Sequence, residues 1–243
     1  MKQPFDTLYA SPRDHVDGFV FDDAVAGVFN DMIHRSVPGY ATILGMLAVF
    51  AEQYAQENSR LYDLGCSLGA STAALSQHAK ASGCRVIAVD NAPAMIGKCK
   101  ANLANLAEGA PVDYVCADIR DVKIMNASVV VLNLTLQFLP CHDRDQIIAE
   151  VYAGLNPGGI LLMTEKISFD SPEQQRLFTR LHHDFKHANG YSHLEISQKR
   201  AALDNVLIPE TLDTHFQRLG KSGFTHIQQW FSCLNFTAML AIK

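Results

Sequence analysis

The sequence predicts an α/β fold in which helices cover both faces of a doubly wound, mostly parallel sheet. First, apolar runs of strand length alternate with amphipathic stretches of helix length between about residues 60 and 166. Second, residues 127–134 are apolar almost throughout, which is typical of a central strand buried on both faces. Third, a glycine-containing turn follows the first apolar run, at residues 63–69. Such a strand-to-helix turn often forms a nucleotide-sized binding site.

The residues before the first strand predict an irregular arm and then two helices. Residues 1–20 contain Pro, Asp and Gly without any period. From Asp22 onwards the apolar positions fall at helical spacing, and Asp22 or Asp23 can cap that helix. Pro38 breaks the helical pattern, and a second helix with an apolar face follows it. Two helices in this position would form a cap over the binding site.

The next segments alternate regularly between strand and helix patterns. The expected strands are residues 60–65, 84–90, 112–118, 127–134 and 160–164. The expected helices are residues 70–81, 93–106 and a segment that leads up to Leu155. Residues 156–159, with the sequence Asn-Pro-Gly-Gly, predict a turn, because proline fixes φ and glycine tolerates positive φ.

Beyond Lys166 the alternation stops, and residues 168–208 predict a helical insertion beside the site. A helix after Pro209 and two strands at residues 225–231 and 236–242 follow, which predicts an antiparallel hairpin at the end of the sheet. The expected fold is therefore Rossmann-like, with a seven-stranded, mostly parallel sheet and an antiparallel last strand. The chain of 243 residues, 48% of them hydrophobic, suits a single domain with an arm and helical cap at residues 1–57.

The composition limits the classes of partner. Lys and Arg total 20 against 25 Asp and Glu, and the net charge of −5 argues against a broad phosphate-binding surface, so direct nucleic-acid binding is not expected. Six scattered cysteines without a C-x-x-C pair are typical of free thiols in a reducing compartment. We therefore expect a cytoplasmic protein without a zinc site. No apolar stretch follows Met1, which argues against a signal peptide or a membrane span.

The glycine turn and a second acidic residue indicate a ligand class. Asp63 favours a positively charged group, and Asp90, at the tip of the second strand, is placed to accept hydrogen bonds from both ribose hydroxyls. A dinucleotide would need a full G-x-G-x-x-G motif, but Ser67 and Ala70 stand where its second and third glycines would fall. S-adenosylmethionine (SAM) carries a sulfonium and an ammonium and no phosphate, so it is the favoured ligand. A glycine turn without any ligand is the remaining alternative.

Three adjacent polar residues in the insertion, His182, His183 and Asp184, suggest a metal site at first sight. Adjacent residues of a helix point to different faces, so we expect no metal there. Structural hydrogen bonding or lining of the pocket is the expected role instead. Lys199, next to Arg200, is either a second anion contact or part of a solvated face.

Four motifs resemble the ordered signatures of the class I methyltransferases. They are residues 63–69, Asp90, residues 117–119 and residues 155–159. Ser67 departs from the pattern, because those enzymes usually have glycine there. In more detail, the chain is similar to the carboxy-S-adenosyl-L-methionine synthase family of bacterial tRNA wobble-uridine modification. The segments that carry this similarity are residues 31–40, 62–70, 133–139, 182–191 and 195–200.

The resemblance implies an unusual reaction without methyl transfer. Enzymes of that family convert SAM and prephenate to carboxy-SAM and phenylpyruvate. The methyl group of a sulfonium is weakly acidic, and its conjugate base, an ylide, is a carbon nucleophile able to capture carbon dioxide released from prephenate. The product would then pass to a tRNA carboxymethyltransferase that makes 5-oxyacetyluridine.

The resemblance also implies which residues bind the ligands. Arg200 matches the family's carboxylate-binding arginine, which can reach in from the neighbouring subunit of a homodimer. Arginine suits this role because its planar fork can hold a carboxylate bidentately. The other implied ligand contacts are Tyr40, Gly65, Cys66, Ser67, Asp90, Asn91, Asp118, Ile119 and Asn133. From the residues alone, Asp118 with Ile119 fits the adenine edge and face, and Asn133 fits the sulfonium end.

No side chain in the sequence is an obvious base for a methyl group, which favours a base supplied by the substrate's own chemistry. Arg35, between the two N-terminal helices, is a further candidate for a prephenate carboxylate, with a salt bridge in the cap as its alternative. Arg35, Tyr40 and Arg200 are thus the candidate catalytic residues. Two other functions stay open: a conventional SAM-dependent methyltransferase acting on a small molecule or RNA, and a SAM-binding protein without turnover.

Overall fold

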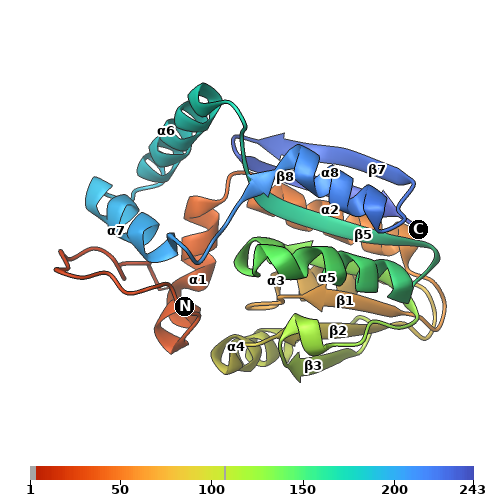
Figure 1. Ribbon diagram of the computed structural model, residues 1–243. Helices are drawn as coiled ribbons and strands as arrows, with labels where there is room; N and C mark the ends of the chain where they lie inside the picture. Colours follow the sequence, from red (N-terminus) through yellow and green to blue (C-terminus); the bar gives the residue numbers. More distant parts are fainter. Residues whose placement is uncertain (1–3, 107) are drawn as a thin grey trace.

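The computed structural model describes residues 4–106 and 108–243, and a sheet flanked by helices lies at its centre (Figure 1). The strands are β1 (Arg60–Leu64), β2 (Arg85–Asp90), β3 (Val112–Cys116), β4 (Ala127–Asn133), β5 (Leu155–Ser168), β6 (Glu210–Thr211), β7 (His226–Cys233) and β8 (Phe236–Ile242). Their order is β3-β2-β1-β4-β5-β8-β7, with β6 paired to β5. β8 runs antiparallel to β5 and β7, whereas the other pairs are parallel. The predicted fold class is confirmed, and β6 is a short addition.

Helices cover both faces of the sheet, as the alternation of the sequence predicts. They are α1 (Asp23–Ser36), α2 (Tyr40–Tyr54), α3 (Ala70–His78), α4 (Pro93–Leu103), α5 (Cys141–Gly154), α6 (Pro172–Ala188), α7 (His193–Leu203) and α8 (Leu212–Lys221). In β4, Val129 and Val131 pack with residues of α2 and α3, while Val130 and Leu132 pack with residues of α5. All four side chains are buried, so this strand is central. Within the described residues, no helix has the length and apolar character needed to cross a membrane.

β5 differs from the expected strand at both of its ends. The sequence predicts a turn at residues 156–159 and a strand over residues 160–164, but β5 already begins at Leu155 and continues to Ser168. The pairing of β5 with β4 shifts register near the start of both strands, so residues 156–159 form a bulge within the strand. Gly158 has the positive φ of 73° that the turn prediction requires. The predicted positive φ is therefore confirmed at Gly158, whereas the prediction of a turn separate from the strand is wrong.

The N-terminal arm, α1, α6 and α7 lie together at one end of the sheet (Figure 1). Residues 4–22 contain no helix or strand, and hydrogen bonds fasten them to α7. The side-chain amide of Gln198 donates to the carbonyl oxygens of Tyr9 and Ser11 at 2.9 and 2.8 Å. The backbone N–H of Phe19 donates to the carbonyl oxygen of Ala202 at 2.9 Å. The arm is thus fixed to the helical insertion although it forms no regular element.

Arg144 of α5 ties the loop after β4 to the segment that returns from the insertion. Its guanidinium is fully buried and donates to the carbonyl oxygens of Gln137, Leu139 and Ile208. It also donates to the carboxylate of Glu210 at 2.6 Å. A buried arginine needs its donors satisfied, and these contacts satisfy them across two segments that are distant in sequence.

Candidate functional site

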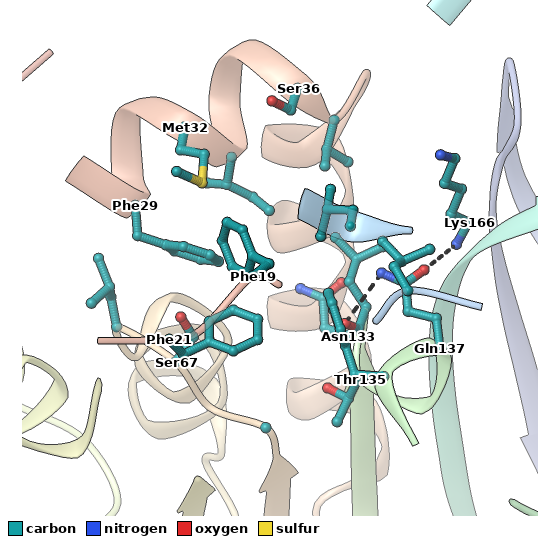
Figure 2. Close-up of a pocket in the computed structure, with 18 of the residues that line it drawn as sticks. Phe19, Phe21, Phe29, Met32, Ser36, Ser67, Asn133, Thr135, Gln137 and Lys166 are labelled. Atoms are coloured by element: carbon teal, nitrogen blue, oxygen red, sulfur yellow. Dashed lines mark hydrogen bonds between the residues drawn. The ribbon is translucent and has the colours of Figure 1, made fainter. Parts of the chain in front are cut away.

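The loops after β1, β2 and β4 open into a cavity of about 390 Å³. They lie at the carboxyl ends of parallel strands, where ligands of doubly wound sheets usually bind. Residues of α1, α6, α7 and the arm form the remaining walls. Figure 2 shows part of this lining, in which the rings of Phe19, Phe21 and Phe29 gather on one side and Asn133 lies on the other.

Most of the ligand contacts expected from the sequence line this one cavity. They are Tyr40, Gly65, Cys66, Ser67, Asp90, Asn91, Asp118, Ile119 and Asn133. They come from the start of α2, the glycine turn, the tip of β2, the short helix η1 (Ile119–Asp121) with the residue before it, and the end of β4. Arg35 and Arg200 lie outside this lining.

The glycine turn has the backbone that its sequence predicts. Gly65 has a φ of 86°, and a side chain there would collide with Thr135 of the facing loop. Gly69 has a φ of 88° and precedes the first residue of α3. Ser67, which departs from the methyltransferase pattern, also has a positive φ of 48° and therefore adopts the conformation of the glycine it replaces.

Asp90 holds the turn and faces the cavity at the same time. One carboxylate oxygen accepts the backbone N–H of Ser67 at 2.9 Å, and the other accepts the backbone N–H of Ala92 at 2.9 Å. Each oxygen keeps a further lone pair. Burial raises the pKa of this carboxyl, while the two backbone hydrogen bonds oppose the rise. The geometry allows Asp90 to accept two hydroxyl groups of a ribose without releasing the turn.

Asp63 lies beneath the cavity and outside its lining. Its side chain is fully buried, and one oxygen accepts the Thr72 hydroxyl at 2.6 Å. Among the described residues, the other oxygen has no hydrogen-bond partner. Burial raises the pKa of Asp63 to about 7. An unpaired buried carboxylate beside the turn supplies the negative potential that a cationic ligand needs.

Replacing this carboxyl with the neutral amide in Asp63→Asn should stabilise the ligand-free protein in a pH-dependent way. The pKa of Asp63 is about 7 in the folded state against a reference value of 3.8, so folding favours its protonated form. Wild-type stability should therefore fall relative to the variant as pH rises from about 4 to 7, by about 3 kcal/mol in total. Urea unfolding of both proteins at pH 4.5, 6 and 8 measures this difference. A difference that does not change with pH would contradict the prediction.

Asn133 and Tyr40 add two polar groups near the end of β4. The Asn133 amide donates to the Ser71 hydroxyl at 3.0 Å, and its oxygen has no partner among the described residues. Burial, together with the charge of Asp63, raises the pKa of the Tyr40 hydroxyl above its ordinary value. The hydroxyl thus stays protonated at neutral pH. Both groups are therefore available to a ligand in the cavity.

Asp118 and Ile119 form a rigid corner of the cavity. The backbone N–H and the guanidinium of Arg120 donate to the Asp118 carboxylate at 2.7–2.9 Å, which lowers the pKa of Asp118. Arg120 is itself paired with Asp143 at 2.8 Å. The fixed carboxylate and the buried Ile119 side chain present a polar edge beside an apolar surface. This combination suits a flat heterocycle such as adenine.

Comparisons with known proteins identify the family of this chain. A family model for a methyltransferase domain matches residues 61–159. The carboxy-S-adenosyl-L-methionine synthase of Shewanella sp. (strain W3-18-1) is 54% identical over 238 residues, which is 98% of both chains. The chain belongs to the carboxy-S-adenosyl-L-methionine synthase family. The synthase of Shewanella oneidensis is 53% identical over the same shares of both chains.

Solved structures relate the carboxy-S-adenosyl-L-methionine synthase fold to that of methyltransferases. Human N-acetylserotonin methyltransferase in complex with SAM has a TM-score of 0.60 and 16% identity, over 91% of this chain and 55% of its own. Magnesium protoporphyrin IX methyltransferase from Synechocystis has a TM-score of 0.59 and 14% identity, over 88% and 84%. At this identity the likeness concerns the fold alone. Family membership confirms the predictions of an enzyme and of SAM rather than a dinucleotide.

Arg200, for which the sequence resemblance implies carboxylate binding, is exposed on α7 and lies outside the cavity of its own chain. It lines a shallow groove between α6 and α7 that also contains Arg176, Arg180, His183 and His193. This groove is open to solvent and strongly basic. Within one chain, Asp90 lines the cavity and Arg200 does not.

Arg35 also lies outside the cavity, where it holds the arm and the insertion together. Its guanidinium donates to the Asn189 carbonyl at 2.8 Å and forms an ion pair with Asp31 at 3.1 Å. It also lies 4.0 Å from the ring centre of Phe5 and 3.7 Å from that of Tyr191. The salt bridge expected as the alternative is present. A prephenate contact for Arg35 stays a prediction that this placement does not support.

The structure adds lining residues that the sequence did not reveal. The aromatic wall formed by Phe19, Phe21 and Phe29 comes partly from the arm, which has no periodic pattern. Lys166 and Lys186 were also not expected, because each is a single cation within an otherwise ordinary strand or helix. Neither lysine has a distinctive sequence signal, because polar residues such as Glu165 and His187 stand directly beside them.

Proposed function

We propose that this enzyme converts SAM and prephenate to carboxy-SAM and phenylpyruvate. The observation that carries the proposal is that one continuous cavity extends from the glycine turn past Asn133 to the walls formed by α1 and α6. It offers a second substrate a place beside SAM. Family membership supports the synthesis of carboxy-SAM, and prephenate is the donor that the sequence resemblance implies.

The chemistry balances without an oxidant or an added base. Aromatisation of prephenate breaks the bond from the ring to its carboxylate carbon, which releases carbon dioxide, and breaks a ring C–O bond, which releases hydroxide. The hydroxide takes a proton from the SAM methyl group and becomes water. The resulting ylide carbon forms a new bond to carbon dioxide and gives carboxy-SAM.

The chain's own residues would orient the two substrates and exclude water. Asp90, Asn133 and the corner at Asp118 would fix SAM, so that its methyl group faces the second part of the cavity. The apolar wall of Phe19, Phe21 and Phe29 would keep bulk water from the ylide, which water would otherwise protonate. With bulk water excluded, the ylide carbon reacts with carbon dioxide instead of being protonated.

We further propose that the enzyme acts as a homodimer and passes its product to a tRNA carboxymethyltransferase for modification of the wobble uridine. The exposed position of Arg200 supports a dimer in which this arginine enters the cavity of the partner chain. The net charge of −5 supports a separate enzyme for tRNA binding.

Incubation of the purified enzyme with SAM and prephenate, followed by mass spectrometry, tests the proposed reaction. A product heavier than SAM by one carbon dioxide should form only when both substrates are present, with an equal amount of phenylpyruvate. Prephenate labelled with ¹³C in its ring carboxylate should transfer the label to this product. Unchanged SAM in every sample would indicate a binding protein. S-adenosylhomocysteine with a methylated acceptor would indicate a conventional methyltransferase.

A further inference from the structure

Three lysines from three different elements meet at the end of the cavity that is distant from the glycine turn. Lys166 follows the centre of β5, Lys186 lies on α6, and Lys199 lies on α7. Figure 2 shows the Lys166 side chain extending away from Asn133, toward the end of α1 that carries Ser36. The side chains of Lys186 and Lys199 are only 8% and 6% exposed. The cavity therefore has a cationic end that is largely shielded from water.

These charges are poorly compensated by the protein itself. Lys199 lies 3.8 Å from a carboxylate oxygen of Asp6 and 3.5 Å from the Ser36 hydroxyl. Within the described residues, neither Lys166 nor Lys186 has a side-chain hydrogen bond or ion pair. Asp6 pairs with Lys199 alone, and the charge of Asp204 acts on Lys166 without forming an ion pair within 4.0 Å, so Lys166 and Lys186 keep no direct counter-charge among these residues. An ammonium group shielded from water without a partner is unfavourable, so the buried Lys186 and the half-buried Lys166 favour an anionic ligand in the cavity.

Neighbouring groups do not remove this positive potential. His182 also lines the cavity, and its Nε2 lies 2.8 Å from the Ser36 carbonyl oxygen. Burial and the adjacent lysines lower the pKa of His182 to about 2, so the ring is neutral and adds no charge. Burial, together with the charges of Lys199, Lys166 and Arg200, lowers the pKa of Lys186 to about 7. A bound anion would offset the repulsion between these positive charges and favour the charged form of Lys186.

We infer that Lys166, Lys186 and Lys199 form the binding site for the second substrate and recognise it as a small dicarboxylate. The inference rests on the proposed function and specifies how the cavity selects prephenate. The two carboxylates of such a ligand can pair with Lys166 and Lys186, the two of these three lysines that have no ion pair within the described residues. Turnover converts the dicarboxylate into phenylpyruvate, which has one carboxylate, so the same lysines should hold the product less tightly and favour its release. Lysine suits this site because its ammonium group is a compact charge on a flexible stem, whereas the planar guanidinium of arginine has fixed donor directions.

Binding measurements with Lys186→Met test the inference. Methionine has similar length and removes the charge. Calorimetric titration of prephenate into enzyme saturated with S-adenosylhomocysteine should show at least about 30-fold weaker binding in the variant. The affinity for S-adenosylhomocysteine itself should change less than about twofold, because the lysines lie away from the turn. Lys98→Met, on an exposed position of α4, is the matched control and should bind prephenate like the wild type.

Phenylpyruvate provides the second probe. The wild type should prefer prephenate over phenylpyruvate by more than about tenfold, and this ratio should shrink in Lys186→Met. The melting temperature should stay equal or rise, because the substitution removes a buried charge. Lys166→Met, in a half-buried position, should weaken prephenate binding in the same way and carries the test if Lys186→Met does not fold.

The outcomes separate this inference from the proposed reaction. Prephenate affinity within about twofold of the wild type in the variants, or an unchanged preference over phenylpyruvate, would overturn the lysine site even if carboxy-SAM is made. Failure of the wild type to bind prephenate would overturn it as well. Lysine-dependent prephenate binding without any carboxy-SAM would support the site and reject the reaction.

Discussion

Arg200→Ala should weaken carboxy-SAM binding by at least about 100-fold and leave SAM binding within about threefold of the wild type. The reason is that the carboxylate added by the reaction is the only group that distinguishes the two ligands. Calorimetric titration of each ligand measures the two affinities. Arg176→Ala, in the same basic groove, is the matched control and should change neither affinity. Equal weakening of both ligands would refute the role of Arg200.

A mixed dimer tests whether Arg200 acts across the subunit interface. We would combine an Arg200→Ala chain with an Asp90→Ala chain, each carrying a different affinity tag, and purify the heterodimer through both tags. If Arg200 enters the partner's cavity, the cavity of the Arg200→Ala chain receives an intact arginine, and about half of the wild-type activity should return. If the heterodimer is as inactive as both parent variants, Arg200 acts within its own chain.

Asp90→Ala should weaken SAM binding by about 100-fold or more. The change removes the acceptor expected for two ribose hydroxyls, and it also releases the backbone N–H of Ser67, which fixes the glycine turn. Titration with SAM measures the effect, and circular dichroism shows whether the fold remains. Asp121→Ala, an exposed acid near the same edge of the sheet, is the control and should bind SAM normally. A loss below about threefold would show that Asp90 does not bind the ligand.

Local patterns were sufficient for the elements that surround the glycine turn. The apolar run of β4 identified the central strand, because only a strand covered on both faces can bury every one of its side chains. Asp22 or Asp23 was expected to cap the first helix, and the cap is Asp22, whose carboxylate accepts the Val25 N–H at 2.9 Å. Gly65 and Gly69 marked the turn, since both need a positive φ. These features depend on residues that are close together in the sequence.

Features that depend on contacts between distant segments could not be predicted in this way. The bulge at residues 156–159 depends on how β5 aligns with β4, and a turn motif does not encode that register. Lys199 was assigned to a solvated face or an anion contact, and only packing of α7 against α1 and α6 explains its burial. Arg35 was a candidate for a substrate carboxylate with a cap salt bridge as the alternative, and its partners Asn189 and Tyr191 lie more than 150 positions away.

The buried Arg144 has a thermodynamic consequence for ligand binding. It fixes the carbonyl groups of Gln137 and Leu139, two residues of the cavity wall, before any substrate arrives. The conformational entropy lost in ordering this wall is therefore incurred when the chain folds and not when SAM binds. More of the contact energy between the wall and its ligand then remains as affinity.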